Sequence, residues 1–296
     1  MDRGSKDEFP SGPDVSRCMA CVVAYDPDAG FEERVRLIAD QVDELFVVNN
    51  FTADTVRTAA GVVLENGNKG GIAGALNMAV AHARSRGYRF LALFDHDSVV
   101  PDGMIRKLVA TAEATRGWIV GPAYNNSATG KAGRFVLDDN GRPVSRWIAG
   151  DEGVRPAYFV ITSGTVLDLH SIPLDATYSE YLGLDMVDID FCLSARARGG
   201  KVYLDTSARM SHGIGNKPAG SSRYDPPNYS MERHAGIIRN RVRTWKKWGR
   251  AFPRFIALDL MVTAADFARN ILLMPNRLAY GRAYLRALMK ELLVSR

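Results

Sequence analysis

The sequence is poor in cysteine and in net charge, and each shortage excludes a class of protein. Three cysteines in 296 residues are too few, and odd in number, for a disulfide framework. Cys18 and Cys21 form one CxxC at the start of an apolar run, and no second CxxC completes a zinc site, so we expect reduced core thiols. A formal net charge of +5 is too modest to indicate nucleic-acid binding.

Long apolar runs are also missing, both at the start of the chain and near its end. Residues 1–17 are polar and rich in Asp, Gly, Ser and Pro, with no apolar core of the kind that a secretory signal needs. We expect this segment to be disordered and partly derived from cloning, and the protein to be cytoplasmic. Asp259, Asp266 and Arg269 interrupt the apolar stretch 255–273, which disfavours a bilayer span.

Apolar runs and helix-like stretches alternate through the first 124 residues. Strands are expected at 19–25, 45–49, 62–65, 90–94 and 118–123. Helices are expected from Phe31, Thr52 and about Ile72, and Pro101 suits the first turn of another. This order predicts an α/β fold with a mostly parallel sheet covered on both faces. Ligands of such sheets bind beyond the carboxyl ends of the strands.

After residue 124 the rhythm changes, and we expect a second half that lies against the same sheet. The patterns predict a hairpin around Asn140-Gly141, a strand with a glycine break over 157–169, a helix from 187 that stops at Gly199, and a strand over 201–205. No internal repeat is present.

Two carboxylates follow the buried strand "FLALF". Asp95 and Asp97 lie one residue apart on a turn, so both side chains can point into one crevice. Buried strands seldom end this way, because an ionised group loses hydration unless a cation meets it. Mg²⁺ or Mn²⁺ suits such a pair, since these ions accept one or two carboxylates and take further ligands from phosphates. Such triplets also arise by chance in solvated turns, and only the place at a strand end favours a metal site.

A glycine-rich turn, "ENGNKGGIAGALN" (65–77), leads into a helix. Gly70 and Gly71 allow close backbone approach to a ligand, the helix N-terminus favours an anion, and Lys69 adds a positive charge. The turn is neither a GxGxxG nor a P-loop. A plain turn before an alanine-rich core helix explains the same residues equally well.

Three carboxylates crowd the start of the helix in "LGLDMVDIDFCLSARARGG" (182–200). Capping explains one of them, Asp185 or Asp188, and Asp190 adds more charge than capping needs. A carboxylate beside a cation site can serve as a general base. His212, after the strand that follows, fits a metal ligand or a structural role.

Together these stretches resemble an inverting family 2 glycosyltransferase of the GT-A fold, closest to the bacterial rhamnosyltransferase-like group. The resemblance covers about residues 19–240. It depends on "NKGGIAGALN", "FDHDS", "TSGT" and "LDMVDIDFCLSARARGG" in this order, followed by "SHGIG".

The resemblance implies a role for each matching position. Asp188 is the expected catalytic base, and Asp97 and His212 are the expected metal ligands. Donor binding is expected from Ala24, Tyr25, Asp26, Asn49, Asn50, Lys69, Gly70, Gly71, Asn77, Asp95 and His96. Acceptor binding is expected from Thr162, Ser163, Gly164 and Asp185.

The implied reaction moves a sugar, with rhamnose from dTDP-rhamnose favoured over a UDP-sugar, onto a hydroxyl of a lipid-linked bacterial surface glycan. Mg²⁺ or Mn²⁺ is the implied cofactor. A metal-dependent nucleotidyltransferase remains an alternative, although such enzymes usually have a more basic phosphate loop than Lys69 alone provides. A non-catalytic relative that binds a glycan or a nucleotide sugar is the third hypothesis.

The last part of the chain is basic and amphipathic. We expect a GT-A catalytic domain over 18–240 and a helical tail over 241–296, where basic and leucine residues alternate from Arg277 onward. Such a tail suits an anionic membrane, which would be the inner face of the cell membrane. Packing on the catalytic domain or on a second subunit, as in a homo-oligomer, explains it equally well.

Overall fold

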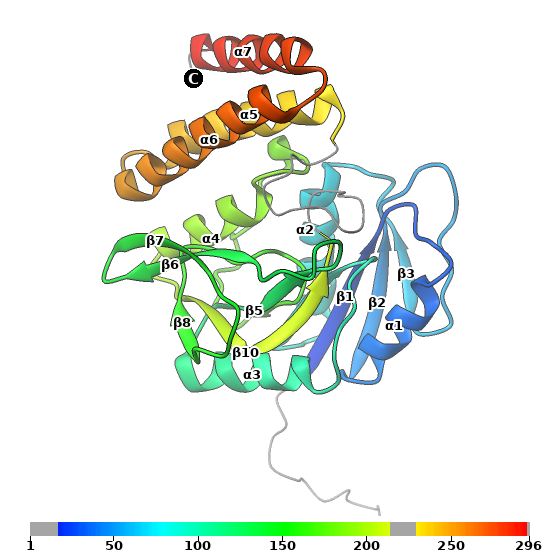
Figure 1. Ribbon diagram of the computed structural model, residues 1–296. Coiled ribbons are helices and arrows are strands. Elements are labelled where there is room, and N and C mark those ends of the chain that lie inside the picture. The colour runs from blue at the N-terminus through cyan, green and yellow to red at the C-terminus, as the bar shows by residue number, and fades with distance from the viewer. Residues whose placement is uncertain (1–16, 214–228, 295–296) are drawn as a thin grey trace, which may run out of the picture.

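The computed structural model describes residues 17–213 and 229–294, and its core is one sheet of eight strands (Figure 1). The strand order is β3-β2-β1-β4-β9-β5-β10-β8. The strands of this sheet are β1 (Cys18–Ala24), β2 (Glu44–Asn49), β3 (Val62–Glu65), β4 (Phe90–Asp95), β5 (Ile119–Asn126), β8 (Val154–Pro156), β9 (Thr165–Asp168) and β10 (Val202–His212).

Four helices follow the strands and pack against the sheet. They are α1 (Phe31–Ala39), α2 (Gly71–Ser85), α3 (Met104–Thr115) and α4 (Val187–Ala197), with the short 3₁₀ helix η1 (Glu180–Leu182) before α4. All seven residues of β1 are buried. A run that is apolar without alternation suits this central place, because both faces of the strand are covered.

The expected α/β fold is confirmed. Strands β3, β2, β1 and β4 are mutually parallel, and β10 is parallel to β5. Strand β9 runs antiparallel between β4 and β5, and β8 pairs antiparallel with β10. Since β8, β9 and β10 all join the sheet, the second half lies against the first, as predicted.

The strand register brings the polar strand ends to one edge of the sheet. Ala24 on β1 pairs with Asn49 on β2, and its neighbour Val23 pairs with Asp95 on β4. Farther along the sheet, His212 on β10 pairs with Asn126 on β5. This edge holds the carboxyl ends of the parallel strands, where such sheets bind their ligands.

The predicted hairpin is confirmed as β6 (Arg134–Asp139) and β7 (Arg142–Trp147). Asn140 and Gly141 between them have φ angles of 50° and 80°. These two left-handed residues give a turn whose twist matches that of the strands, and Asn-Gly adopts it at low cost.

Two expectations were wrong, and a third was confirmed only in part. No helix begins at Thr52, because the Asn49 side chain bonds the backbone of Phe51 and Asp54 and holds the segment in an irregular path. Pro101 lies in the turn before α3 and not in its first turn, which begins at Met104. In the stretch 157–169 only β9 is a strand, because Gly164 at φ +83° turns the chain just before it.

Three helices stack beyond one end of the sheet, at the end of the molecule opposite α3 (Figure 1). They are α5 (Met231–Trp248), α6 (Pro253–Leu273) and α7 (Arg277–Leu293), and they form the expected carboxyl-terminal helical extension. Among the described residues, no helix is both long and apolar enough to cross a bilayer. The expected boundary at residue 240 falls inside α5 and stays a prediction, and the segment expected to be disordered lies, except for Arg17, outside the described residues.

Candidate active site

Asp95, Asp97 and His212 come together at the edge where β4 and β10 end. One ligand atom from each lies within 4.8 Å of the other two. His212 Nε2 is 3.7 Å from Asp95 Oδ2, and His212 Nδ1 is 3.9 Å from Asp97 Oδ1. Burial raises the pKa of Asp95, the nearby His212 partly offsets this, and the Asp97 charge adds to it.

The residues of this cluster fit a divalent cation. His212 is 8% exposed, and its Nδ1 is buried without a hydrogen-bond partner in the described structure. Two carboxylates and one imidazole form a donor set that Mn²⁺ or Mg²⁺ accepts. The buried His212 Nδ1 has no hydrogen-bond partner among the described residues and lies beside two carboxylates, which is explained if a cation binds between these three groups.

The aspartate turn is supported from beneath by two serines. Ser163 and Ser98 are each 1% exposed, and their hydroxyl oxygens are 2.5 Å apart. The N–H of Asp95 donates to Ser163 Oγ at 3.3 Å. Ser163, expected to bind the acceptor, is therefore covered by the turn that it supports.

Arg34 on α1 also holds the turn, and sequence reasoning missed it. Its Nε donates to the carbonyl oxygen of His96 at 2.8 Å, and its guanidinium pairs with Asp28 at 2.5 Å. These contacts tie the loop after β1 to the turn after β4. No motif signals a side chain whose partner is a backbone carbonyl 62 residues away.

Asp188 lies in the first turn of α4, half-buried and within electrostatic reach of Asp95. Its pKa is raised to about 6, first by burial and then by the charges of Asp185 and Asp95. A helix N-terminus lowers the pKa of a carboxyl, as does the N–H of Ile189, which donates to Asp188 Oδ1 at 2.8 Å. Burial outweighs both, so the group can exchange a proton near neutral pH.

Neither Asp185 nor Asp188 is the N-cap of α4, contrary to expectation. The N-cap is Met186 at φ 73°, whose side chain forms no capping hydrogen bond, and Asp188 bonds the N–H of Ile189 from within the first turn. Asp185 instead accepts from the Arg233 guanidinium on α5 at 3.3 Å. A left-handed residue before the helix points the Asp185 carboxylate at α5 and away from the helix end.

Asp190, the third carboxylate of this group, is a structural anchor. It is 1% exposed, and it accepts from Lys247 Nζ at 2.9 Å, Trp248 Nε1 at 2.7 Å and Ser179 Oγ at 2.6 Å. Two of these donors come from α5, so Asp190 fastens α5 to the helix that bears Asp188.

Other α5 side chains hold the segment before α4. Asn240 Nδ2 donates to the carbonyl oxygens of Leu182 and Asp185, and Arg243 donates to that of Tyr181. The carboxyl-terminal helices therefore form one wall of the candidate site.

The glycine-rich turn packs against η1. A Cβ on Gly70 would lie 2.7 Å from the Glu180 carboxylate, and one on Gly71 would lie 2.3 Å from the Gly183 carbonyl oxygen. Asn77 donates to Tyr178 O and Glu180 Oε1, both at 3.0 Å. Gly70, Gly71 and Asn77, all expected to bind the donor, therefore contact residues 178–183, the segment that leads to Asp188. Lys69 is exposed.

The ends of β1 and β2 form a second part of the site. Asn49 and Asn50 are buried, and their amides bond Glu65 and Asn68. Tyr25 is 51% exposed and meets Phe51 edge to face at 5.4 Å. Ala24 and Asp26 adjoin this aromatic pair. Phe51 was missed, although an aromatic directly after Asn49-Asn50 was the available signal.

Thr162 and Gly164 complete the loop that contains Ser163. The N–H of Gly164 donates to Leu93 O at 2.7 Å, and a Cβ on Gly164 would lie 2.6 Å from Pro122 and 2.7 Å from Met210. The loop thus presses on the end of β4. Of its three residues, Thr162 is the one that is partly exposed.

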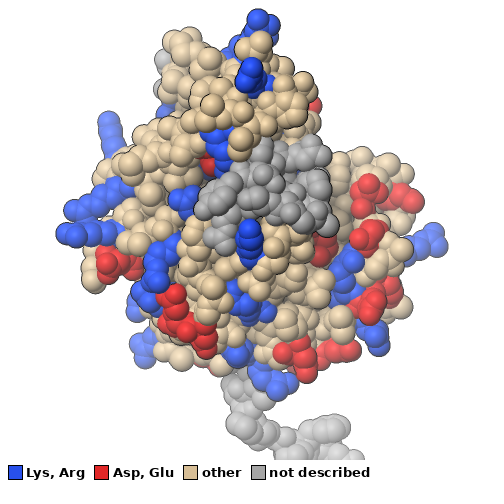
Figure 2. Space-filling view, in the orientation of Figure 1, with Lys and Arg blue, Asp and Glu red and all other residues tan. Residues whose placement is uncertain are grey.

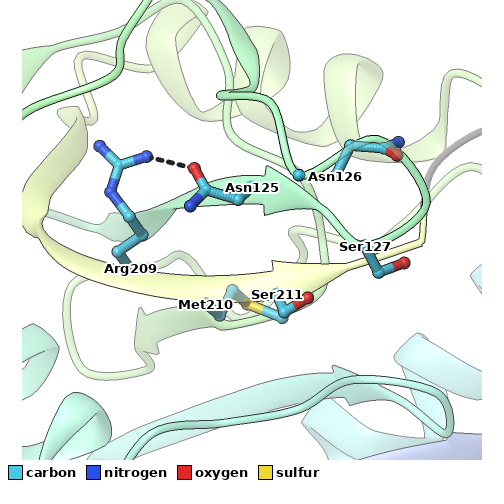
Figure 3. A pocket seen from close by; sticks show the side chains of 7 residues that line it. Asn125, Asn126, Ser127, Arg209, Met210 and Ser211 are labelled. Atoms are coloured by element: carbon cyan, nitrogen blue, oxygen red, sulfur yellow. Dashed lines mark hydrogen bonds between the residues drawn. The ribbon is translucent and has the colours of Figure 1, made fainter. Parts of the chain in front are cut away.

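A hollow of about 440 Å³ lies next along β5 and β10 (Figure 3). Amide, hydroxyl and guanidinium side chains contribute to its lining, which consists of Asn125, Asn126, Ser127, Gly130, Arg209, Met210 and Ser211. Figure 3 shows Arg209 bonded to Asn125, at 3.0 Å. The hollow adjoins the aspartate–histidine cluster, since the N–H of Ser127 donates to His212 O. Such groups suit a hydroxyl-rich ligand, and sequence reasoning did not single them out.

Comparison with known proteins shows which family and which fold this chain resembles. Residues 20–148 match the family model described as Glycosyl transferase family 2. The dTDP-rhamnosyl transferase RfbF of Shigella flexneri is 24% identical over 234 residues, which are 76% of this chain and 78% of that protein.

Two solved structures share the fold. GalNAc-T7 with UDP, GalNAc and Mn²⁺ superposes with a TM-score of 0.53 at 11% identity, over 77% of this chain and 48% of that one. S. aureus TarS 1-349 with UDP-GlcNAc superposes with a TM-score of 0.50 at 13% identity, over 95% and 74%. The chain thus spans about half the length of the GalNAc-T7 structure. The GT-A fold and the resemblance to family 2 glycosyltransferases of the rhamnosyltransferase-like group are confirmed.

Proposed function

We propose that the protein is an inverting, metal-dependent glycosyltransferase. It transfers a sugar, with rhamnose from dTDP-rhamnose favoured, to a hydroxyl of a bacterial surface glycan. The observation that carries the proposal is the carboxylate–histidine cluster at the carboxyl edge of the sheet, with Asp188 of α4 within electrostatic reach of its Asp95. The resemblance to a dTDP-rhamnosyl transferase supports the choice of donor.

Asp188 is the proposed base. In this proposal it removes the proton of the acceptor hydroxyl, whose oxygen attacks the anomeric carbon from the face opposite the leaving diphosphate. One displacement inverts the configuration and leaves no covalent sugar–enzyme intermediate. A pKa near 6 leaves Asp188 ionised at pH 7 and basic enough to accept the proton.

The donor is proposed to lie across the ends of β1, β2 and β4. In this proposal Tyr25 and Phe51 offer aromatic surface to the nucleobase of the donor, and Asp95 and His96 face its ribose or its sugar. Lys69 at the start of α2 offers positive charge to the diphosphate. When bound between Asp97 and His212, Mg²⁺ or Mn²⁺ supplies charge that offsets the growing charge of the leaving group.

The acceptor is proposed to be a lipid-linked glycan in polysaccharide biosynthesis, met at the inner face of the cell membrane. Thr162, Asp185 and the hollow beside His212 are the proposed contacts. Support comes from the amide and hydroxyl groups in the lining of the hollow, which can bond sugar hydroxyls. Further support comes from the positively charged carboxyl-terminal helices, of which α5 bonds Asp185.

A nucleotide-sugar panel tests the proposal. The protein is incubated with dTDP-rhamnose and several UDP-sugars, each with and without Mn²⁺, while thermal shift and product release are followed. Metal-dependent release of a nucleoside diphosphate, with dTDP-rhamnose preferred, is expected. Release of pyrophosphate would identify a nucleotidyltransferase, and donor binding without turnover on any acceptor would identify a binding protein.

A further inference from the structure

One face of α7 is apolar and uncovered. Leu278, Leu285 and Leu292 follow one another at seven-residue steps and are 75%, 51% and 50% exposed. Met289 and Leu293 fall in the same sector of the helix and are 54% and 74% exposed. A single exposed leucine is ordinary, whereas five apolar side chains in one stripe indicate a surface that binds something.

The opposite face of α7 is occupied by contacts within the chain. Tyr280 and Gly281 are buried, and Glu291 forms an ion pair with Arg243 of α5 at 2.6 Å. Lys246 of α5 donates to carbonyl oxygens at the end of α7, including that of Val294 at 2.9 Å. The orientation of α7 is therefore set, and its apolar stripe faces outward.

A row of cations borders the stripe. Arg282 lies at the edge of the stripe, and Arg286 and Lys290 follow at four-residue steps on the adjoining flank of α7. All three are exposed, and within the described residues none has an acidic partner at ion-pair distance. Residues 229–294 contain 13 Lys and Arg against four Asp and Glu. Figure 2 shows blue side chains over these helices, while most Asp and Glu of this face lie elsewhere.

We propose that α7 lies on an anionic lipid bilayer, with its apolar stripe among the acyl chains and its basic flank at the headgroups. Apolar residues beside unpaired cations are the combination that binds an interfacial helix to anionic lipid. Because α7 packs on α5, and α5 bonds Asp185 and Asp190, docking would fix the orientation of residues 182–190 relative to the surface. The inference rests on the proposed function, because docking on a membrane serves the reaction if the acceptor is lipid-linked.

A second copy of the chain suits this face less well. An isologous dimer with antiparallel α7 helices brings each flank against its own counterpart. Arg282, Arg286 and Lys290 would then face the same three cations. Like charges at that spacing repel, whereas anionic headgroups pair with them.

Flotation of the full chain tests the proposal. Protein is mixed with vesicles of phosphatidylcholine containing one quarter phosphatidylglycerol, or with pure phosphatidylcholine, and spun through a density gradient. Binding is expected on the anionic vesicles, at least tenfold weaker on neutral ones, and reduced by 0.5 M NaCl.

Two sets of variants locate the surface. Replacing Arg282, Arg286 and Lys290 together by Gln should weaken binding about a hundredfold. Leu285→Ser with Met289→Ser should abolish it. Each changes exposed side chains, and circular dichroism verifies the fold. The controls are Arg106→Gln on α3, at the far end of the molecule, and Leu174→Ser, whose side chain is 84% exposed. Both controls should float like the unchanged protein.

Failure of this inference can be distinguished from failure of the proposed function. Flotation needs no catalysis, so Asp188→Asn should float normally even though transfer is lost. No flotation on anionic vesicles overturns the inference. A dimer in light scattering that Leu285→Ser dissociates, without flotation, would replace it by a second-copy interface. Equal binding by the Gln variant would also overturn it.

Discussion

At the scale of single residues, the burial of the Asp188 carboxyl affects both the stability of the fold and the proposed chemistry. Burial raises its pKa to about 6, so an ionised Asp188 costs the folded state free energy. Asp95 bears the same kind of cost, since burial raises its pKa as well. A neutral side chain of the same size would be more stable at either position, and carboxyls shifted in this way mark candidate functional sites.

Replacing Asp188 by Asn should remove transfer and keep donor binding. We expect turnover to fall by a factor of 10² to 10⁴, the range for loss of a general base, with donor affinity changed less than threefold. Single-turnover transfer and calorimetric donor titration measure the two quantities. Asp175→Asn, which changes an exposed carboxylate paired with Arg198, is the control. Normal turnover of Asp188→Asn would exclude it as the base.

The pH profile should follow the same group. Because the base acts ionised, kcat/KM should be constant above pH 7 and fall tenfold per unit once the pH drops below about 6. Stability moves in the opposite direction. A carboxyl whose pKa is raised by folding favours the folded state below its unfolded pKa and loses that benefit as the pH rises through about 6. Asp188→Asn should therefore gain on the order of 2 kcal/mol at pH 8 relative to pH 4.

Removing a metal ligand should separate binding of the cation from folding. Asp97→Ala should lose the thermal shift that Mn²⁺ gives in the presence of a nucleoside diphosphate, while its own melting temperature stays within about 2 °C, since Asp97 is exposed. Differential scanning fluorimetry over a Mn²⁺ series measures both. A full Mn²⁺ response from this variant contradicts the assignment of Asp97.

At the scale of elements, the glycine-rich turn and η1 meet with no space between them. Gly71→Ala combines a φ of +63° with a Cβ only 2.3 Å from Gly183 O, whereas Gly87→Ala has a φ of +72° and open space. We expect Gly87→Ala to cost about 1 kcal/mol and Gly71→Ala about 3 kcal/mol or more, with weaker donor binding as well. Urea unfolding of both variants gives the difference. Equal costs would mean that η1 moves aside freely.

Strand ends and the hairpin turn could be predicted from the sequence, because their signals are local. An apolar run stopping at Asp95 fixes a strand end, and Asn140-Gly141 fixes a hairpin. Asp190 could not be assigned, since its donors Lys247 and Trp248 lie almost sixty residues later. The segment after Asn49 was wrong because a side chain bonded to the backbone outweighed helix propensity there.

At the scale of the whole molecule, the ion pair between the buried Asp190 of α4 and Lys247 of α5 helps to join the sheet domain to the carboxyl-terminal helices. Lys247→Met should destabilise the protein by about 3 kcal/mol, because it leaves the Asp190 carboxylate buried and unpaired. Adding Asp190→Asn should recover part of that loss, and Lys247→Arg most of it. Urea unfolding of the four proteins forms the cycle. A second transition in Lys247→Met alone would show that the two parts had come apart.

The shared helix α5 restricts how relatives of this protein can be recombined. Its side chains bond Leu182, Asp185 and Asp190, so the wall around Asp188, the proposed base, belongs to both parts. A chimera that exchanges tails at residue 240 would pair one parent's loop with the other parent's helix. Exchanges meant to alter acceptor choice should therefore join the parents upstream of Tyr178, so that loop and helix are inherited as one unit.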